Sequence, residues 1–364
     1  MTPLEQEIRA IIESEGPITV ERYMSLALAH PFYGYYMNRD PFGAAGDFTT
    51  APEISQMFGE LLGLWAAEVW TLMGSPNPIR LVELGPGRGT LMADALRAAR
   101  VVPGLPRALQ VHLVETSPAL IERQKEELAK SGASISWHTD VEDVPAGPAI
   151  FLANEFFDAL PVRHYVKTSR GWCERVIGID ANGRLAFGVS GLVEPYLRVQ
   201  APEGSIVEIG AVGHRLMASL ATRIAAEQGA ILVIDYGHAQ TALGETLQAL
   251  KSHRFVDPLS TPGEADVTAH VDFAGLSRAA RASGANVFGP VNQGRFLAAL
   301  GIFERADGLK TSASPTQGDA IDAALHRLVA EDDVNMGKLF KALIVADPRL
   351  PPLPGVSHQG EPQA

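Results

Sequence analysis

Two stretches of the chain combine residue types and spacing that could do chemistry, and the first is rich in glycine. It reads Glu83-Leu84-Gly85-Pro86-Gly87-Arg88-Gly89. Glycines let the chain turn sharply and let a ligand approach the backbone closely. A dinucleotide-binding loop has the spacing G-x-G-x-x-G, whereas this loop has G-x-G-x-G with the carboxylate of Glu83 two residues before it. That carboxylate would repel a pyrophosphate and attract an ammonium group, which predicts S-adenosylmethionine as the cofactor.

Three further acids could contact this cofactor. Glu115 follows a β-type run, and in sheets of this kind an acid there accepts hydrogen bonds from the ribose hydroxyls. Asp140 could meet the adenine amino group, or it could be a solvated acid like its near neighbours in the sequence. Asp47 could close a lid over the ligand or form a local Asx-turn with Gly46. The predicted cofactor-binding residues are therefore Glu83, Gly85, Gly87, Gly89, Glu115, Asp140 and Asp47.

The second stretch is acidic and reads Asn154-Glu155-Phe156-Phe157-Asp158-Ala159-Leu160-Pro161. A guanidinium offers five donors in a fork, which suits paired carboxylates such as Glu155 and Asp158. Carboxylates could also localise the charge of the guanidinium and align one nitrogen with a methyl donor. Asn154 could instead orient an amine or an amide through its carbonyl. The alternative is that Asp158 caps a turn and Glu155 is a surface acid.

His270 adds a candidate base downstream, in the stretch that runs from Thr268 to Phe273. It could relieve the attacking nitrogen of its proton, or the whole stretch could be a structural segment that packs beside the site. The predicted catalytic residues are Glu155, Asp158, Asn154 and His270, and we predict no metal site.

Alternating strands and helices must position these residues. We expect strands at 79–84, 109–114, 134–138, 149–153 and 230–235, with helices at 90–99, 118–130 and 212–227. Such alternation implies a parallel sheet with helices on both faces, and open sheets of this type bind ligands at the carboxyl ends of their strands. Two late strands, 285–291 and 339–346, complete the expected set. The predicted fold is therefore α/β, a Rossmann-like class I methyltransferase sheet of seven strands.

Segments outside this alternation suggest additions to the core. Residues 1–78 are predicted to form an N-terminal helical cap with a lid loop, and a T-x-x-E capping box of Thr50 and Glu53 is expected to start its second helix. Within the methyltransferase domain, 79–347, the β-type runs of 163–192 predict an antiparallel insertion. The Pro-rich end, 348–364, is predicted to be a flexible tail.

Composition limits the class of protein. The net charge is −12, which is a poor match for nucleic acid or an anionic membrane. The single cysteine, Cys173, cannot form an internal disulfide and fits a reducing compartment. The acidic start resembles neither a secretory signal nor a transit peptide, and the apolar stretch 61–73 is too short to span a bilayer. We therefore expect a cytoplasmic protein without membrane insertion or a nucleic-acid partner.

Several stretches together resemble the MidA-like family of class I methyltransferases, which includes the mitochondrial complex I assembly factor that methylates an arginine. The resemblance rests on the glycine-rich and acidic stretches and on 30–36, 46–55, 234–237 and 266–273, although Ala51 stands where the family pattern has Ser. It implies a protein-arginine methyltransferase whose protein substrate is a subunit of respiratory NADH dehydrogenase or a bacterial equivalent.

Other functions stay open at this point. A non-catalytic assembly chaperone on a methyltransferase fold is one alternative, although the intact glycine-rich stretch with Glu83 and Glu115 speaks against it. A Rossmann dehydrogenase would need to bind nicotinamide, and a small-molecule N-methyltransferase would act on a different substrate. The oligomeric state is not determined by the sequence.

Overall fold

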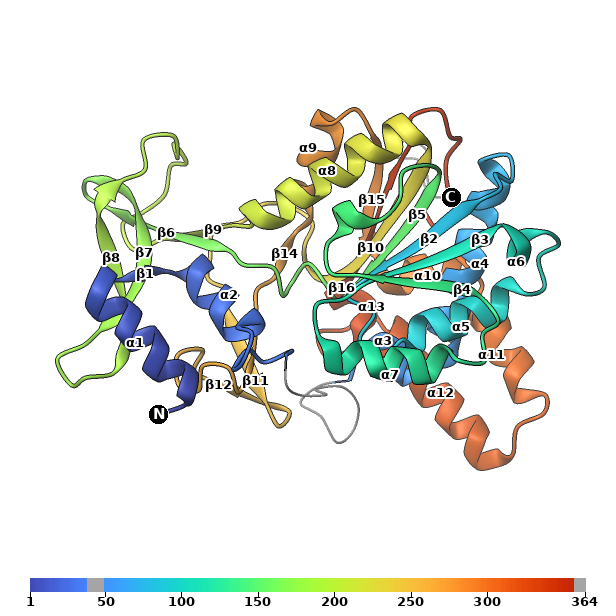
Figure 1. Ribbon diagram of the computed structural model, residues 1–364, viewed down its shortest axis with the longest axis horizontal. Coiled ribbons are helices and arrows are strands. Elements are labelled where there is room, and N and C mark those ends of the chain that lie inside the picture. The colour runs from blue at the N-terminus through green and yellow to red at the C-terminus, as the bar shows by residue number, and fades with distance from the viewer. Residues whose placement is uncertain (38–48, 357–364) are drawn as a thin grey trace.

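The computed structural model describes residues 1–37 and 49–356, and Figure 1 shows a large twisted sheet flanked by a smaller β-rich part. The seven strands that form the path of the main sheet are, in spatial order, β15 (Asn286–Asn292), β16 (Phe340–Ala346), β10 (Gly229–His238), β5 (Ala149–Asn154), β2 (Ile79–Leu84), β3 (Leu109–Val114) and β4 (Ser134–His138). The strands from β10 to β4 are parallel, while β16 runs antiparallel to both of its neighbours. The predicted α/β methyltransferase fold is confirmed.

An eighth strand departs from the expected count. The two-residue β14 (Val271–Asp272) pairs with the end of β10, and it directly follows His270. The sequence pattern does not reveal so short a strand, because its two residues pair only with Gly237 and His238.

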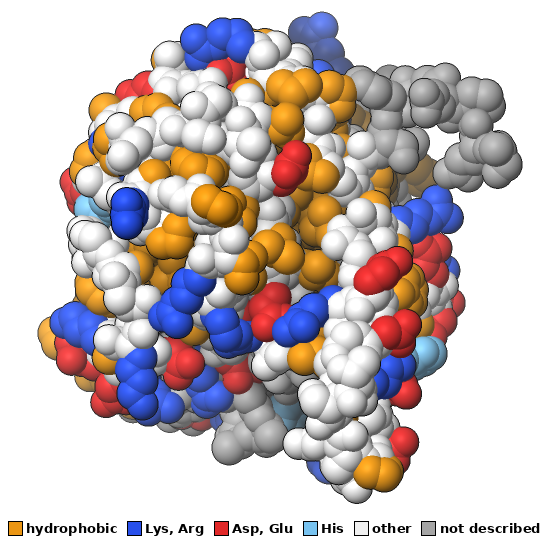
Figure 2. Space-filling model, turned by 90° about the vertical axis from the view of Figure 1, so that its right-hand side faces the viewer, with side chains coloured by type: hydrophobic (Ala, Val, Ile, Leu, Met, Phe, Trp, Pro, Cys, Tyr) orange, Lys and Arg blue, Asp and Glu red, His pale blue; other side chains and the backbone are white. Residues whose placement is uncertain are grey.

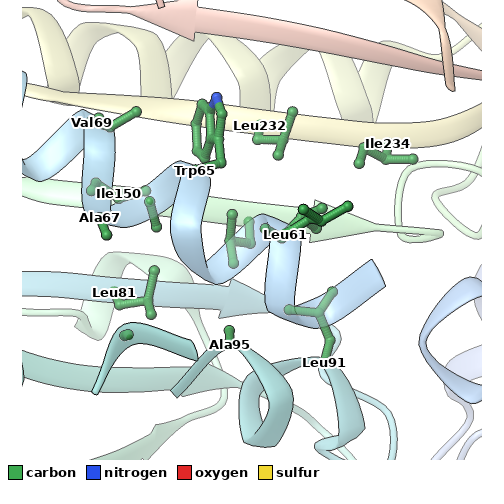
Figure 3. Close-up of a cluster of buried hydrophobic side chains, with 14 of the residues drawn as sticks. Leu61, Trp65, Ala67, Val69, Leu81, Leu91, Ala95, Ile150, Leu232 and Ile234 are labelled. Atoms are coloured by element: carbon green, nitrogen blue, oxygen red, sulfur yellow. The ribbon is translucent and has the colours of Figure 1, made fainter. Parts of the chain in front are cut away.

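Helices cover both faces of the main sheet because its strands are apolar on both sides. One face carries Leu81 and Leu232, which pack with α4 (Gln56–Leu72) and α5 (Thr90–Ala99). Figure 3 shows Leu61 and Trp65 of α4 over this face. The other face packs with α8 (Ala211–Glu227) and α9 (Phe273–Ala282). The remaining helices near the sheet are α3 (Ala51–Ile54), α6 (Leu105–Ala108), α7 (Pro118–Leu128), α10 (Gln293–Ala299), α11 (Ile302–Lys310), α12 (Pro315–Val329), α13 (Met336–Leu339) and the 3-10 turn η1 (Val141–Asp143).

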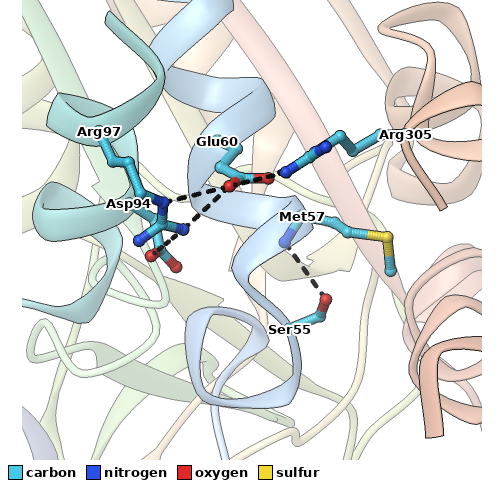
Figure 4. Close-up of polar contacts among 6 residues, drawn as sticks. All are labelled: Ser55, Met57, Glu60, Asp94, Arg97 and Arg305. Carbon is cyan, nitrogen blue, oxygen red and sulfur yellow. Dashed lines mark hydrogen bonds and ion pairs between the residues drawn. The ribbon is translucent and has the colours of Figure 1, made fainter. Parts of the chain in front are cut away.

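The described part of residues 1–78 does not form one cap, contrary to the prediction. The first helices, α1 (Pro3–Glu15) and α2 (Val20–Ala29), belong to the smaller part of the molecule. By contrast, α4 is part of the core of the main sheet. Its buried Glu60 accepts hydrogen bonds from Arg97 of α5 and Arg305 of α11, which ties three helices together (Figure 4).

The β insertion is larger than predicted. Its strands are β6 (Arg163–Thr168), β7 (Gly171–Ile179), β8 (Leu185–Val193) and β9 (Ile206–Ile209), so it continues beyond residue 192. The N-terminal β1 (Ile18–Thr19) joins this antiparallel sheet by pairing with β7. A separate three-stranded sheet consists of β11 (Gln248–Lys251), β12 (Arg254–Val256) and β13 (Asp266–Thr268), and it packs with α1 and α2 through one apolar cluster.

The described part of the predicted flexible tail, residues 348–356, is packed on the core. Leu353 is 2% exposed, and Trp65 Nε1 donates a hydrogen bond of 3.2 Å to the carbonyl of Pro354. The prediction of a loose tail from residue 348 onward is therefore wrong for this stretch, because its two leucines, Leu350 and Leu353, join the main hydrophobic cluster.

On the end of the molecule opposite the insertion sheet, hydrophobic side chains gather in the upper half of the view, and basic and acidic side chains are intermixed below them (Figure 2). Within the described residues, no helix has the length and hydrophobicity needed to cross a membrane.

Candidate active site

A cavity of about 700 Å³ opens at the carboxyl ends of β2, β3, β5 and β10. The glycine-rich stretch, which follows β2, and the acidic stretch, which follows β5, both contribute residues to the lining of this cavity. Of the predicted site residues, the cavity is lined by Glu83, Gly85, Gly87, Glu115, Asp140, Asn154, Glu155, Asp158 and His270. Gly89 is not among its lining residues, and Asp47 lies outside the described residues.

The glycine-rich loop follows β2 and leads into α5. Gly85, Gly87 and Gly89 have φ angles of 63°, 54° and 86°, which are left-handed conformations that favour glycine. A Cβ on Gly85 would also lie 2.8 Å from Cδ2 of Phe156 in the acidic stretch. Gly89 is the N-cap of α5, so its role is to turn the chain into the helix.

Glu83 is the acid that best fits an ammonium group in this cavity. It is 3% exposed, and its Oε2 has no hydrogen-bond partner within the described part of the chain. Burial, with a smaller effect from the charge of Glu115, raises the pKa of Glu83 to about 8. A buried carboxylate oxygen without a partner is costly, and a cationic ligand would offset that cost.

Glu115 is held beside the glycine-rich loop by Gln124, which the sequence did not mark. The fully buried Gln124 donates from Nε2 to the carbonyl of Gly87 at 2.8 Å and to Glu115 Oε2 at 3.2 Å. The other oxygen of Glu115 accepts from the N–H of Ser117 at 2.8 Å. Burial raises the pKa of Glu115. Gln124 therefore links the two predicted cofactor contacts, and no motif could have revealed it because its partners lie on other elements.

Asp140 occupies the outer part of the cavity. Its side chain is exposed, and Oδ1 accepts from the N–H of Glu142 at 3.0 Å as the N-cap of η1. Asp140 is therefore exposed to solvent and caps a local turn, and it also lines the cavity in which the cofactor was expected.

The acidic loop after β5 is organised by Asp235, which lies in the carboxyl-terminal half of β10. Oδ2 of Asp235 accepts from the backbone N–H groups of Phe156, Phe157 and Asp158 at 3.1, 2.9 and 3.3 Å. Oδ1 accepts from the N–H of Tyr236 at 2.9 Å. Asp235 is fully buried, and it was assigned no role from the sequence.

Glu155 lies in a strained position of this loop. Its φ angle is 50°, and its Oε1 accepts from the N–H of Ala51 at 2.9 Å and from Nδ2 of Asn154 at 3.0 Å. Burial raises the pKa of Glu155 to about 7. The amide of Asn154 thus contacts Glu155, while its own Oδ1 has no partner within the described part of the chain.

Asp158 is 7% exposed and is the more deeply buried of the two carboxylates. The hydroxyl of Tyr236 donates to its carboxylate, but Oδ1 has no hydrogen-bond partner in the described residues. Burial raises the pKa of Asp158 to about 6. The interpretation of Glu155 as a surface acid is therefore unsupported, and both carboxylates face the cavity.

A second set of polar residues also lines the cavity. Tyr36 donates to Asp266 Oδ1 at 2.8 Å, and both residues line the cavity with Thr268 and Gln248. The ring of His270 lies edge-on to Tyr236, with ring centroids 5.3 Å apart. The stretches 30–36 and 266–273, which carry part of the family resemblance, thus contribute Tyr36, Asp266, Thr268 and His270 to the lining of the cavity.

The predicted capping box of Thr50 and Glu53 is wrong. Thr50 is the N-cap of the short α3 (Ala51–Ile54) without a side-chain hydrogen bond, and Glu53 Oε1 instead accepts from Thr90 Oγ1 at 2.6 Å. Ser55 breaks the expected long helix and caps α4. Glu53 of α3 thus contacts the first residue of α5, and both line the cavity. Among the described residues, no cluster of three His, Cys, Asp or Glu could hold a metal.

This sheet order, with a glycine-rich loop after β2 and an acid after β3, defines a class I methyltransferase dependent on S-adenosylmethionine. Residues 61–291 match the model of the family of S-adenosyl-L-methionine-dependent methyltransferases named Methyltransf_28, and the chain belongs to this family. The unpaired oxygen of Glu83 and the carboxylate of Glu115 fit this cofactor.

Known proteins resemble the chain over most of its length. It is 40% identical to the "Protein arginine methyltransferase NDUFAF7, mitochondrial" of Danio rerio, over 84% of this chain and 78% of that protein. It is 38% identical to the Drosophila melanogaster homolog of that protein, over 93% and 84%. A likely methyl transferase from Burkholderia thailandensis, solved with S-adenosyl-homocysteine bound, has a TM-score of 0.80 at 28% identity and covers 97% of this chain and 92% of its own.

These relatives correct one prediction. The expected cytoplasmic location is contradicted, because the curated relatives from fish, mouse and fly are all named as mitochondrial proteins. A single cysteine fits any reducing compartment, so this feature could not identify the cytoplasm.

Proposed function

We propose that this methyltransferase acts on an arginine of a protein, and that Glu155 and Asp158 bind the guanidinium. The observation that carries the proposal is Asp158, a buried carboxylate that lines the cavity with one oxygen unpaired in the described residues. Burying such an oxygen without a partner is unfavourable, and a cationic fork with five donors would satisfy it. The relatives named as protein arginine methyltransferases support the same substrate class.

The two carboxylates differ in what they can do. Glu155 is held in place by the N–H of Ala51 and the amide of Asn154, so it is preorganised. The carboxylate of Asp158 accepts a hydrogen bond from the hydroxyl of Tyr236, and the backbone N–H of Asp158 donates to Asp235. Both carboxylates would draw the positive charge toward two guanidinium nitrogens and leave the third nitrogen aligned for attack. Orientation of this kind lowers the barrier by several kcal/mol, with about 7–11 kcal/mol as the upper range.

The cofactor end of the cavity has a separate role. When bound, S-adenosylmethionine supplies a methyl group on a positively charged sulfur. Glu83 would hold its ammonium group, and Glu115 would accept from its ribose hydroxyls. Phe156 of the acidic loop lies against Gly85 and lines the cavity, so the acidic loop and the glycine-rich loop meet there.

We propose further that the protein substrate is a subunit of NADH dehydrogenase. This finer proposal rests on the resemblance of the stretches 30–36 and 266–273 to the MidA-like family. These stretches contribute Tyr36, Asp266, Thr268 and His270 to the substrate end of the cavity.

Labelled methyl transfer into lysate protein tests the substrate class directly. The full chain would be incubated with S-adenosylmethionine carrying a tritiated methyl group and with lysate from cells that lack the enzyme, and labelled sites would be identified by mass spectrometry. The proposal expects methylarginine on one or few proteins. Label confined to lysine or to small molecules would overturn it, and the second result would favour a small-molecule N-methyltransferase.

A further inference from the structure

A second, smaller cavity lies directly behind the active site. Its volume is about 130 Å³, and it is bordered by β9, β14 and the starts of α8 and α9. In the described part of the chain, only Leu160 and His270 line both this cavity and the larger one. Leu160 is apolar and cannot carry a proton, so among the described residues His270 is the one titratable group that lines both cavities.

The second cavity is rich in groups that exchange protons. Besides His270, it is lined by His214, His238, Glu208 and Asp272. No comparable cluster lines the cofactor end of the larger cavity, where the described titratable groups are mainly carboxylates.

We propose that His270 accepts the proton released during methyl transfer and passes it into the second cavity, where His238 and His214 relay it toward solvent. The proposal rests on the proposed function, because an arginine that enters as a cation must lose one proton per methyl group. The attacking nitrogen gains a carbon–nitrogen bond, the carbon–sulfur bond breaks, and its electron pair stays on sulfur. The nitrogen then loses a proton to the neutral imidazole of His270, and the net products are a methylated guanidinium and one proton in water.

His270 is held in an orientation that suits this role. Its backbone N–H donates to Thr246 Oγ1 at 2.8 Å, and its ring lies edge-on to Tyr236, which itself donates to Asp158. The candidate proton acceptor is therefore fixed beside the residue that holds the proposed substrate clamp.

The charged groups around His270 favour its neutral form. Burial lowers the pKa of His270, and His238 on β10 and Lys341 on β16 act in the same direction. Glu208 on β9 acts in the opposite direction with a smaller effect than burial and His238. A neutral imidazole at neutral pH can accept a proton, and the basic neighbours ensure that it does not keep it.

The exit end of the relay leads to the surface through Asp272. Oδ2 of Asp272 accepts from Thr241 Oγ1 at 2.7 Å and pairs at 3.5 Å with Arg278, whose side chain is 62% exposed. His214 reaches this end because Gly275 has no Cβ; an added Cβ would lie 2.2 Å from Nε2 of His214. Burial lowers the pKa of His214, while Asp272 acts in the opposite direction.

Chemical rescue tests the acceptor. We would measure tritium incorporated into lysate arginine by wild type, His270→Gln and His270→Ala, with His326→Gln as the control because His326 is exposed on α12 and lines neither cavity. We expect both His270 variants to lose activity by about 10²-fold, the lower end of the usual contribution of a general base. Added imidazole should restore His270→Ala in proportion to its neutral fraction. Binding of S-adenosylhomocysteine, measured by calorimetry, should stay unchanged.

Two results would overturn the assignment of His270: wild-type labelling of arginine by His270→Gln, or a defect of His270→Ala that imidazole does not relieve. Both presuppose that the wild-type enzyme labels arginine, so they are distinguishable from a failure of the proposed function, in which wild type itself labels none.

A titration without substrate tests the relay. In protein labelled with nitrogen-15 at histidine, His238→Gln should raise the pKa of His270, because His238 lowers it in the wild type. His238→Gln and His214→Gln should also slow arginine labelling several-fold while keeping affinity for S-adenosylhomocysteine. An unchanged His270 titration, together with full activity of both variants, would show that the proton leaves through the open cavity and that the relay is wrong.

Discussion

Asp235 accepts a hydrogen bond of 2.9 Å from the backbone N–H of Phe157, seventy-eight residues earlier in the chain. The same oxygen accepts from the N–H groups on either side, so one buried carboxylate shapes the loop that carries Glu155 and Asp158. Because a residue of β10 fixes the loop that follows β5, these two neighbouring parallel strands build the site together.

Asp235→Asn should therefore destabilise the protein and abolish most methyl transfer. The amide can offer only one accepting oxygen, and its NH₂ group would face N–H donors. Loss of such contacts at a buried site costs about 1–3 kcal/mol. Urea denaturation measures the change, with Asp319→Asn as an exposed control on α12. Equal stability and equal activity of Asp235→Asn and wild type would contradict this role.

Cofactor binding should release a proton at pH 7. The pKa of Glu83 is about 8 in the free protein, so this carboxyl is mostly protonated there. A ligand ammonium favours the ionised form, so binding should drive the proton off, and release should decline as pH rises above 8. Calorimetry of S-adenosylmethionine in buffers of different ionisation enthalpy counts the protons. The release should be lost in Glu83→Gln, and a buffer-independent enthalpy for wild type would refute the prediction.

The glycine-rich loop should tolerate no side chain at its centre. Gly87 has a φ angle of 54° and lines the cavity, so Gly87→Val should prevent binding of S-adenosylhomocysteine. Glu115→Ala should weaken binding by about 1–3 kcal/mol, because it removes hydrogen bonds to a charged group. Gly183→Val is a matched control, since Gly183 also has a positive φ angle of 72° but no neighbouring atoms within 4 Å. Calorimetry that gives wild-type affinity for Gly87→Val and Glu115→Ala would show that the cofactor lies elsewhere.

The packed stretch after β16 should contribute to stability. Leu353→Ala should lower the free energy of unfolding by about 2–5 kcal/mol, the usual range for a buried leucine. Val334→Ala, at a position 89% exposed, is the control and should change stability by less than about 0.5 kcal/mol. Chemical denaturation at constant pH measures both, and equal small effects would mean that residues 348–356 detach readily.

The sequence predicted those parts of the fold that depend on local pattern. The strands and helices near Ile79–Leu84 and Thr90–Ala99 were found within a residue, because apolar periodicity and the glycine-rich turn are local signals. Glu53 shows where local reasoning fails, since it contacts Thr90 of α5 in place of its expected capping partner.

For the site too, the sequence predicted local features but not contacts between distant segments. Most predicted residues line one cavity, because the carboxyl ends of neighbouring parallel strands meet. Gln124 and Asp235 were not assigned their roles, because each acts on backbone groups of distant segments. The second cavity behind His270 could not be anticipated either, since it depends on how the insertion meets α8 and α9.

The most direct test of the account is methyl transfer by Asp158→Asn and Glu155→Gln, which keep the shape of each side chain and remove its charge. With wild type and the arginine-bearing substrate protein identified from lysate, we predict a fall of about 10²-fold or more in the rate for each variant, as for loss of a preorganised polar group. Affinity for S-adenosylhomocysteine should be unchanged, because Glu83 and Glu115 form the cofactor end of the cavity. Methylation of that arginine at the wild-type rate by both variants would contradict the claim that the acidic loop binds the guanidinium.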